Sequence, residues 1–322
     1  MKILTVGAGI IGTIYGWVLS ETGNEVTHLV RRGKAARLAA GVPIDMLDSR
    51  KGHQKRFHGR YNLRVTETID PASGFELVIV PTKPCQLEAA LKQIVPQIGP
   101  ARFLLLTQNW NGTADIDAIL PQSKYLFADA KAGGVFNDGT LVAALFPSLD
   151  LGQVDGGHGE ALETIGRIFK HAGIRPAFQH NILHYIWVQY AINAGLWPAL
   201  VRAGGLANLL RDRRLGQLSL QAVKECLDVV ASRGIDLASY PDTHMFYRTS
   251  FIMRRIAAFM ITLMFRFNES VRRTSAHALG DPLEIRTAFY DLLGTGRDLQ
   301  VPMPVMESFE RDILRFTSAA AG

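Results

Sequence analysis

Residues 3–12 read Ile-Leu-Thr-Val-Gly-Ala-Gly-Ile-Ile-Gly, and this stretch decides the fold of the N-terminal half of the chain. The apolar run Ile3–Val6 is typical of a buried strand, and the segment Ile11–Leu19 predicts an amphipathic helix directly after it. A Gly-x-Gly-x-x-Gly pattern between a strand and a helix is the fingerprint of a dinucleotide-binding turn. An ordinary glycine-rich turn between a strand and a helix is the alternative interpretation.

Each glycine of this pattern has its own physical role. Gly7 permits the tight turn, Gly9 removes the Cβ that would keep backbone N–H groups away from a pyrophosphate, and Gly12 lets the helix pack closely on the strand. At the start of the helix, free amides and the positive end of the helix dipole face the phosphate charge. The predicted cofactor site therefore includes Gly7, Gly9, Ile10, Ile11 and Gly12.

The end of the second predicted strand, Glu25–Val30, indicates which nucleotide binds. A site for NAD places an Asp or Glu there, where the carboxylate accepts a hydrogen bond from the ribose 2′-hydroxyl. This chain instead has Arg31, Arg32 and Lys34, with no carboxylate among them. Because arginine pairs with a 2′-phosphate through two parallel charge-assisted bonds, we predict NADP(H) as the cofactor and Arg31 as its ligand. A solvated basic loop is the alternative.

The overall composition is that of a globular protein. The chain has 322 residues, 48% of them hydrophobic and 20% charged, which is enough for two domains with separate cores. The formal charge of +6 is modest, and no stripe of interleaved basic and aromatic residues is present. These features favour anionic small molecules as partners and argue against nucleic acid.

Cysteine usage and apolar patterning give expectations about location. Cys85 and Cys226 lie far apart and form no metal-ligand spacing, so we expect free thiols in a reducing cytoplasm and no metal site. The chain leads straight from its start into the first strand, and we expect no signal peptide. In the apolar stretch Phe251–Phe267 the longest uncharged run, Ile256–Phe265, is too short to span a bilayer, so we expect no membrane segment.

Strands and helices alternate through the first half of the chain. Phe75–Val80 and Phe103–Leu106 are predicted buried strands, and Gln86–Ile94 is a predicted helix between them. In an open parallel sheet, ligands bind beyond the carboxyl ends of the strands. Lys83 and Asn109 follow these two strands, and we therefore expect both beside the nicotinamide half of the cofactor. A solvated lysine and a turn-forming asparagine are the alternative interpretations.

The character of the sequence changes near residue 181. The region 126–154 is rich in glycine and β-forming residues, and we expect antiparallel edge strands there. From residue 182 to residue 317 the pattern is almost wholly helical. We therefore predict an α/β nucleotide-binding domain over residues 1–180 and an all-α substrate domain over residues 181–322, with the active cleft between them.

The order and spacing of these features resemble the ketopantoate reductase family, the 2-dehydropantoate 2-reductases. The matching positions are the glycine turn with Arg31, Thr82-Lys83, Gln108–Gly112, Trp187 with Asn193, and Glu284 followed by Val301–Pro304. The resemblance implies a Rossmann-type N-terminal domain and a helical C-terminal domain similar to that of 6-phosphogluconate dehydrogenase. It also implies reduction of a 2-oxo acid by NADPH.

Three positions depart from the family pattern, and the first matters most: a lysine is replaced by Gln189, the second asparagine of the helix motif is replaced by Trp197, and the family's substrate serine has no clean counterpart. Family members resemble Trp-x-Lys-x-x-x-Asn on the first long helix of the second domain, and their lysine is the general acid that protonates the developing alkoxide. In this chain the lysine position is Gln189, while the asparagine is kept as Asn193. The resemblance places Glu284 with these two residues on the substrate side. A glutamine donates a hydrogen bond but gives up no proton near neutral pH.

Another group must therefore supply the proton if the chain reduces a carbonyl. His277 lies seven positions before Glu284 and is the first candidate, with a surface or capping histidine as the alternative interpretation. Lys83 and Lys131 are further candidates. The catalytic residues that we predict are thus Gln189, Asn193, Glu284 and His277.

Three functions are consistent with these residues. The first is NADPH-dependent reduction of a 2-oxo acid, namely 2-dehydropantoate or a related substrate. The second is an opine-type NADP-dependent dehydrogenase acting on an imine, which can already carry its proton. The third is a protein that senses NADP(H) without turnover, against which the retained Asn109, Asn193 and Glu284 argue. If the chain forms a homodimer, we expect the contact in the helical domain.

Overall fold

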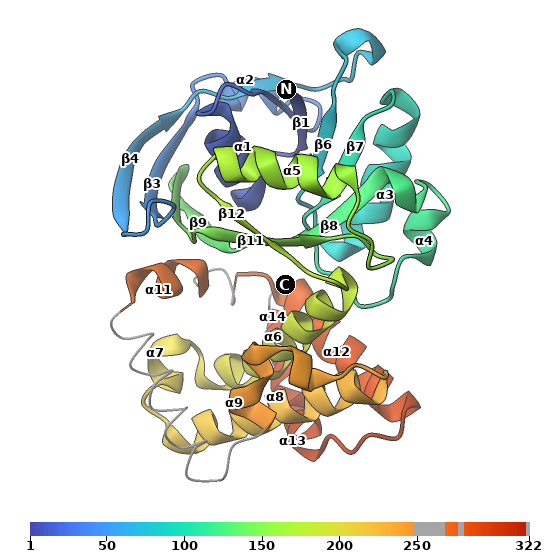
Figure 1. The fold of residues 1–322 in the computed structure, drawn as a ribbon. Coiled ribbons are helices and arrows are strands. Elements are labelled where there is room, and N and C mark those ends of the chain that lie inside the picture. The colour runs from blue at the N-terminus through green and yellow to red at the C-terminus, as the bar shows by residue number, and fades with distance from the viewer. Residues whose placement is uncertain (248–267, 276–279, 320–322) are drawn as a thin grey trace. The chain divides into compact units, whose positions relative to one another are not determined.

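The computed structural model describes residues 1–247, 268–275 and 280–319 (Figure 1). They form two compact units. Unit 1 contains Met1–Leu183 together with Arg273–Ser275, and unit 2 contains the described residues of 184–272 and of 276–322. Unit 1 combines strands and helices whereas unit 2 is helical, so the predicted fold class of each half is confirmed.

Residues 1–183 contain an eight-stranded sheet with the strand order β12-β11-β8-β7-β6-β1-β2-β5 (Figure 1). Its strands are β1 (Lys2–Val6), β2 (Glu25–Leu29), β5 (Arg64–Thr66), β6 (Leu77–Val80), β7 (Arg102–Leu105), β8 (Tyr125–Asp129), β11 (Ser148–Gly152) and β12 (Arg175–Phe178). All neighbours pair in parallel except β8 with β11. The chain passes from β1 to β2 and β5 on one side and returns to β6 on the other, so the strand order reverses at β1.

The central position of β1 in the sheet explains why its residues are apolar. β1 pairs with β2 on one side and with β6 on the other, and Ile3 and Leu4 have no exposed surface. A parallel strand that is covered on both faces needs apolar residues on both faces. The α-helices that lie wholly within this unit are α1 (Ile10–Ser20), α2 (Ala35–Leu38), α3 (Pro84–Ile94), α4 (Ala114–Asp117) and α5 (Glu160–His171), and the end of α11 (Glu269–Ser275) also belongs to it.

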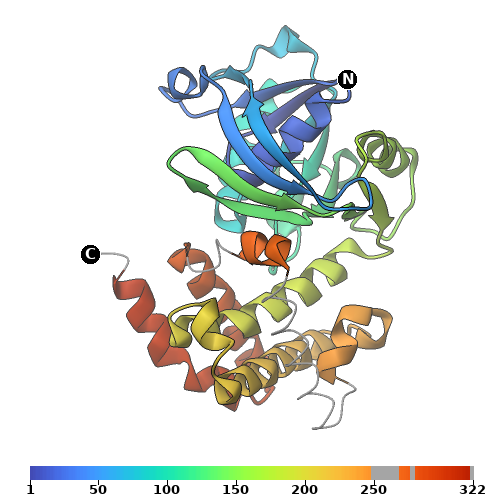
Figure 2. The same cartoon turned by 90° about the vertical axis from the view of Figure 1, so that its left-hand side faces the viewer.

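A second sheet within residues 1–183 has the strand order β4-β3-β10-β9 (Figure 2). Its strands are β3 (Val42–Asp48), β4 (Lys55–Tyr61), β9 (Ala132–Asn137) and β10 (Thr140–Leu145). The expectation of antiparallel edge strands over residues 126–154 is therefore partly wrong. β9 and β10 form an antiparallel hairpin, but β10 also pairs in parallel with β3, and β8 lies inside the large sheet in parallel with β7. Residue patterns predict strands, but they do not say which strands will pair.

Helix α1 contacts β1 and β2 of the large sheet and β9 and β10 of the small sheet. Its residues from Gly12 to Leu19 are all buried, which explains why so few of them are polar. Two glycines allow this close approach. A Cβ on Gly12 would lie 3.2 Å from the side chains of Thr5 and Pro81, and a Cβ on Gly16 would lie 2.5 Å from Nε2 of His28.

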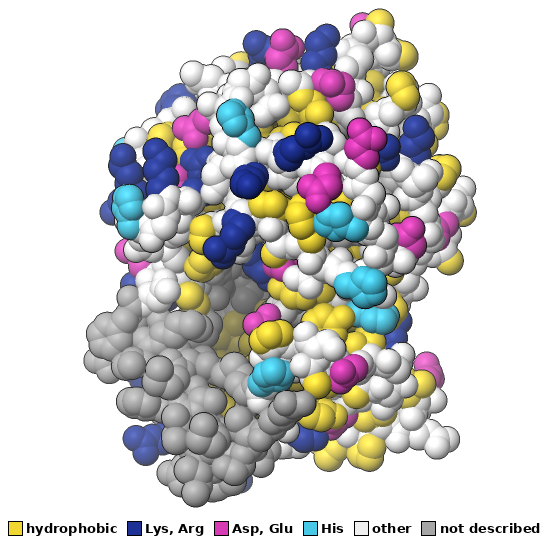
Figure 3. Space-filling view, viewed as in Figure 1, with side chains coloured by type: hydrophobic (Ala, Val, Ile, Leu, Met, Phe, Trp, Pro, Cys, Tyr) yellow, Lys and Arg dark blue, Asp and Glu magenta, His cyan; other side chains and the backbone are white. Residues whose placement is uncertain are grey.

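β4 forms an edge of the small sheet and is strongly basic. Lys55, Arg56, His58 and Arg60 are exposed along it, and Lys and Arg side chains gather where β3 and β4 lie (Figure 3). Charged side chains on an edge strand oppose pairing with a strand of another chain. The basic stretch that follows Asp48 in the sequence is thus one strand of a hairpin.

The small sheet also holds a buried carboxylate between two arginines. Arg56 donates to both oxygens of Asp45 over 2.8 and 2.6 Å. Arg273, from the end of α11 (Glu269–Ser275), donates from Nη1 to the backbone oxygen of Asp45 over 2.9 Å and to its Oδ1 over 3.2 Å. The guanidinium of Arg56, together with that of Arg273, holds the pKa of Asp45 below its ordinary value.

Unit 2 consists of helices packed around small residues. In the described part of the chain these helices are α6 (Ile182–Ala203), α7 (Leu206–Leu209), α8 (Arg213–Ser232), α9 (His244–Tyr247), α12 (Pro282–Asp298), α13 (Pro304–Ser308) and α14 (Glu310–Ala319). Gly195 of α6 lets that helix approach α8, because a Cβ there would lie 2.5 Å from the Cα of Val223. Gly296 of α12 likewise makes room for Met303, because an added Cβ would collide with its Sδ.

None of the helices that the structure describes is both long enough and apolar enough to cross a bilayer. The apolar stretch Phe251–Phe267, which we expect not to span a membrane, lies outside the described residues.

We expect Arg273→Ala to destabilise the protein more than Arg56→Ala. The side chain of Arg273 is 10% exposed, and its loss leaves a buried carboxylate with one partner, which costs about 3 kcal/mol in the free energy of unfolding. The side chain of Arg56 is 62% exposed, so its ion pair contributes at most about 1 kcal/mol. Denaturant unfolding of both variants measures the difference.

The same measurement at low pH gives a second check. Because the folded-state pKa of Asp45 lies below its ordinary value of 3.8, the stabilisation is present above that pH and is lost as the pH falls further. Arg273→Ala should therefore lose less stability on acidification than the unmodified protein. Equal losses for the two proteins would contradict this account of Asp45.

Candidate functional site

The glycine turn lies where β1 ends, at the position in the large sheet where the strand order reverses. Gly7 has a φ of +91°, a conformation that disfavours other residues, and its N–H donates to the backbone oxygen of Leu29 over 2.7 Å. Gly9 is the N-cap of α1 and makes no side-chain capping bond, so the first amides of α1 are open to another acceptor. A Cβ on Gly9 would have no atom within 4 Å. The position of that Cβ beside Gly9 is therefore open space.

Gly12 faces the opposite way, into the protein. A Cβ there would lie 3.1 Å from the backbone oxygen of Gly7 and 3.2 Å from the side chains of Thr5 and Pro81. Gly9 thus borders open space, whereas Gly12 is tightly packed.

The carboxyl ends of the neighbouring strands add polar groups to the same edge of the sheet. After β6, the Oγ1 of Thr82 is buried without a hydrogen-bond partner among the described residues, and Lys83 is exposed at the N-cap of α3. After β7, Asn109 is 8% exposed, and its side chain donates to the backbone oxygen of Gly112 and accepts from the N–H of Asn111. These two bonds lie within its own turn, and the predicted contact of Asn109 with the cofactor stays a prediction.

Lys131 follows β8 and is ion-paired. Its Nζ lies 2.7 Å from Oδ2 of Asp129 and 3.5 Å from Oδ2 of Asp150. Gln179 donates to the other oxygen of Asp150 over 2.6 Å. These contacts hold the ammonium group in place at the end of a sheet strand.

A carboxylate that sequence reasoning missed binds the backbone of the basic loop after β2. Arg31 and Arg32 are exposed in this loop. Oε1 of Glu67 accepts from the N–H of Ala35 over 2.9 Å, and the backbone amides of Ala35 and Gly33 lower the pKa of Glu67. Glu67 directly follows β5, and the pairing of Leu29 with Thr66 brings it to the loop. Only the strand order could have revealed this proximity.

In unit 2, Gln189 and Asn193 lie one turn apart on α6. The Nε2 of Gln189 donates to Oδ2 of Asp242 over 3.0 Å, so its amide is held by a carboxylate. Glu284 lies in the first turn of α12, where its own N–H donates to the capping Asp281 over 3.2 Å. His277, the predicted proton donor, lies outside the described residues.

α6 and α12 are joined by a buried hydrogen bond next to these side chains. The hydroxyl of Tyr190 donates to Oδ2 of Asp291 over 2.6 Å. Burial raises the pKa of Tyr190, and the charges of Asp291 and Glu284 raise it further. Tyr190 is therefore a brace between two helices and a poor proton donor.

Other motif positions in unit 2 have structural roles. Trp187 stacks on His184, with the ring centroids 5.5 Å apart, and the guanidinium of Arg233 lies 3.6 Å from its ring. The Val301–Pro304 turn leads into α13, whose first amides donate to the buried carboxylate of Glu225.

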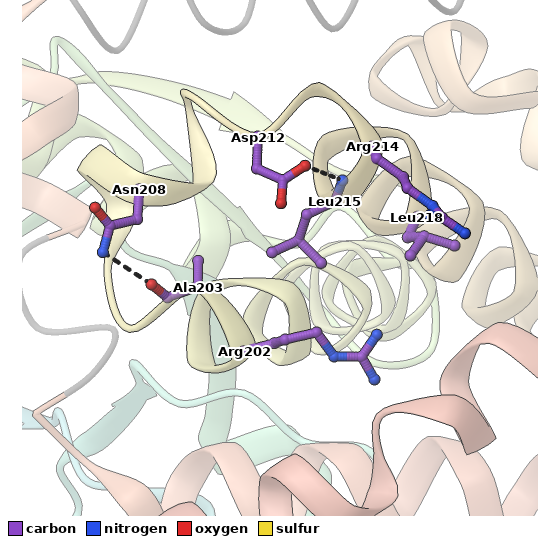
Figure 4. Close-up of a pocket in the computed structure, with 7 residues that line it drawn as sticks. All are labelled: Arg202, Ala203, Asn208, Asp212, Arg214, Leu215 and Leu218. Atoms are coloured by element: carbon purple, nitrogen blue, oxygen red, sulfur yellow. Dashed lines mark hydrogen bonds between the residues drawn. The ribbon is translucent and has the colours of Figure 1, made fainter.

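A hollow in unit 2 lies at the end of α6 (Figure 4). Two of its polar side chains bind nearby backbone groups. Asp212 accepts from the N–H of Leu215 and so caps α8, and Asn208 donates to the backbone oxygen of Ala203. Arg202, which also lines it, is paired with Asp312 over 2.8 Å. The hollow carries none of the predicted site residues.

Comparisons with known proteins bear on both units. A family model described as "Ketopantoate reductase PanE/ApbA" matches residues 3–143. The 2-dehydropantoate 2-reductase of Pyrococcus abyssi is 24% identical over 260 residues, which cover 77% of this chain and 80% of that protein. The solved 2-dehydropantoate 2-reductase of Geobacter metallireducens superposes with a TM-score of 0.74 at 16% identity, over 98% of this chain and 99% of that chain. D-mandelate dehydrogenase, solved with NADH and anilino(oxo)acetate, superposes with a TM-score of 0.71 at 17% identity over 100% of both chains.

Substitutions at the second and third glycines of the turn, Gly9 and Gly12, should separate coenzyme binding from folding. We expect Gly9→Val to leave the thermal unfolding midpoint nearly unchanged, because the new side chain enters open space, and to abolish NADPH binding. Gly12→Ala should instead lower the midpoint, because its Cβ meets backbone and side-chain atoms. Fluorescence titration with NADPH and thermal unfolding measure the two effects. Unchanged NADPH affinity in Gly9→Val would make the turn purely structural.

Proposed function

Because this chain belongs to the ketopantoate reductase family, we propose that it is an NADPH-dependent oxidoreductase that reduces a 2-oxo acid to the 2-hydroxy acid. The first substrate to test is 2-dehydropantoate, whose product is pantoate. The observation that carries the proposal is the glycine turn, with open space beside Gly9 at the reversal of strand order. In this proposal residues 1–180 bind the cofactor and residues 181–322 carry the substrate-side groups.

The residues of unit 1 fit a dinucleotide. In the proposal, the turn from Gly7 to Gly12 and the first amides of α1, at Ile10 and Ile11, would hold the pyrophosphate. Arg31 would bind the 2′-phosphate, and the buried hydroxyl of Thr82 offers a donor beside the turn. When bound, NADPH supplies the hydride for the carbonyl carbon of the substrate.

The substrate side is where this chain differs from its family pattern. In the proposal Asn193 and Glu284 orient the substrate, and Gln189 donates a hydrogen bond to the carbonyl oxygen. Asp242 already accepts from the Gln189 amide over 3.0 Å, which fixes the direction of that amide. An amide stabilises a developing alkoxide without protonating it, so the proton must come from another group, of which His277, Lys83 and Lys131 are the candidates.

The glutamine at position 189 favours a second candidate function, the reduction of an imine. An imine that is already protonated needs no general acid, so a glutamine at position 189 is less costly there. A panel of 2-oxo acids, each with and without amines, tests both functions through NADPH oxidation. Turnover only with an amine present would indicate the imine reaction, and NADPH binding without any turnover would indicate a sensor.

We further propose a cytoplasmic location and, for any homodimer, a contact through the helical domain.

Arg31→Ala should weaken the binding of NADPH about ten- to a hundredfold while changing NADH binding far less. The reason is the loss of charge-assisted bonds to the 2′-phosphate, which NADH lacks. Glu67→Gln is the matched variant, because it removes a negative charge and keeps an acceptor oxygen for the N–H of Ala35. It should strengthen NADPH binding and leave NADH binding unchanged. Equal weakening of both nucleotides by Arg31→Ala would contradict the assignment.

Gln189→Lys should raise kcat on a 2-oxo acid by about tenfold or more, because it restores an ammonium general acid. The new lysine would lie beside Asp242, and a neighbouring carboxylate favours the protonated amine. Turnover should therefore fall with rising pH, and in the double variant with Asp242→Asn this fall should occur at lower pH. Gln189→Met is the control of similar size and should show no gain. Efficient reduction of 2-dehydropantoate by the unmodified protein, with no gain in Gln189→Lys, would contradict the proposal that position 189 limits the rate.

A further inference from the structure

A buried histidine contacts the first glycine of the coenzyme turn. His28 of β2 has no exposed surface, and its Nδ1 lies 2.9 Å from the backbone oxygen of Gly7. On the other side of the ring, Nε2 lies 3.2 Å from the hydroxyl of Tyr61, which ends β4 of the small sheet. The proposed reaction uses neither side chain.

The partners determine where the ring proton sits. A backbone oxygen can only accept, so Nδ1 of His28 carries the hydrogen and donates to Gly7. Nε2 of the neutral ring is then the acceptor for the hydroxyl of Tyr61. Burial lowers the pKa of His28 and raises that of Tyr61 to about 12, so both groups stay neutral near pH 7.

The bond to Gly7 fixes the orientation of a whole peptide group. The peptide bonds of the described residues are trans, so the C=O of Gly7 and the N–H of Ala8 point in opposite directions. Since His28 binds the C=O, the N–H of Ala8 points away from His28. The N–H of Gly7 is held as well, by the backbone oxygen of Leu29 over 2.7 Å. A glycine has the conformational freedom to let this peptide flip, and the bond from His28 opposes the flip.

The ring itself has little room to move. A Cβ on Gly16 would lie 2.5 Å from Nε2 and 2.7 Å from Cε1 of His28, so the ring fills the space that the glycine leaves on α1. Tyr61 packs edge-on against the ring, with the centroids 5.7 Å apart.

We propose that His28 is a positioning residue for the coenzyme, which locks the Gly7–Ala8 peptide so that the N–H of Ala8 faces the pyrophosphate. Tyr61 holds the tautomer of His28 that makes this bond. The inference rests on the proposed function, because it assumes that the turn binds NADPH. The residue acts through the backbone of Gly7 and touches neither the substrate nor the coenzyme.

Two nucleotides separate this role from general damage to the unit. NADPH contains the pyrophosphate, whereas adenosine 2′-monophosphate has the 2′-phosphate and no pyrophosphate. We expect His28→Leu to weaken NADPH binding about ten- to a hundredfold, the worth of a hydrogen bond to a charged group, and to change adenosine 2′-monophosphate binding less than about threefold. Isothermal titration with both nucleotides measures the ratio.

Conservative variants keep the test informative if His28→Leu fails to fold. His28→Asn can place an N–H near the position of Nδ1 and should restore NADPH binding to within a few fold. His28→Gln places its amide near Nε2, where it meets Tyr61, and should bind NADPH as weakly as His28→Leu. Tyr125→Phe is the matched control, because it removes a hydroxyl that donates to Asp117 over 2.6 Å, away from the turn, and it should change neither affinity.

The outcomes are distinguishable. Equal NADPH affinity in His28→Asn and His28→Gln would overturn the inference, as would parallel losses for the two nucleotides. If the unmodified protein binds no NADPH at all, the proposed function fails and this inference fails with it.

Discussion

Close packing of α1 against two sheets is the constraint on which the rest of unit 1 depends. The helix is buried from Gly12 to Leu19, and its contacts with β1, β2, β9 and β10 leave no face for solvent. Such an arrangement is stable only where the side chains between helix and strand are small. Gly12 and Gly16 meet that condition, since an added Cβ would lie tightly against Thr5 and Pro81 at Gly12 and would collide with the ring of His28 at Gly16. Of the three glycines in the fingerprint, Gly12 therefore serves packing as well, whereas Gly7 and Gly9 border open space.

This packing also shapes the candidate coenzyme site. Two residues of β2 bind the backbone of Gly7: Leu29 accepts from its N–H, and His28 donates to its C=O. These two bonds fix the backbone orientation at the start of the turn. Opposite charges meet at the loop after β2. The exposed arginines of the loop attract a 2′-phosphate, and Glu67, which follows β5 and binds the loop backbone, repels it. Discrimination between the two nicotinamide nucleotides is then a balance of these side chains, and a change of one charge can shift it.

Features set by local backbone chemistry could be predicted from the sequence, and features set by strand pairing could not. The positive φ of Gly7, the start of α1 and the helical class of unit 2 follow from neighbouring residues alone. The second sheet depends on β3 meeting β10, nearly one hundred positions later, and no periodicity reports such a partner. Glu67, His28 and Tyr61 were missed for the same reason, because each reaches the site through a neighbouring strand. Asn109 shows a different limit, since its amide serves its own turn.

The position of Arg273 limits how this chain can be divided. Residues 273–275 belong to unit 1, although the chain on both sides of them belongs to unit 2. A fragment that ended at residue 180 would contain every strand of both sheets and the whole glycine turn. It would nevertheless lack the guanidinium that binds Asp45 and the backbone oxygen of Ala143. Gene fusions that exchange the helical half between relatives would meet the same difficulty, because the incoming segment must bring an arginine at this position. Unit 1 is thus contiguous in its strands but not in its stabilising contacts.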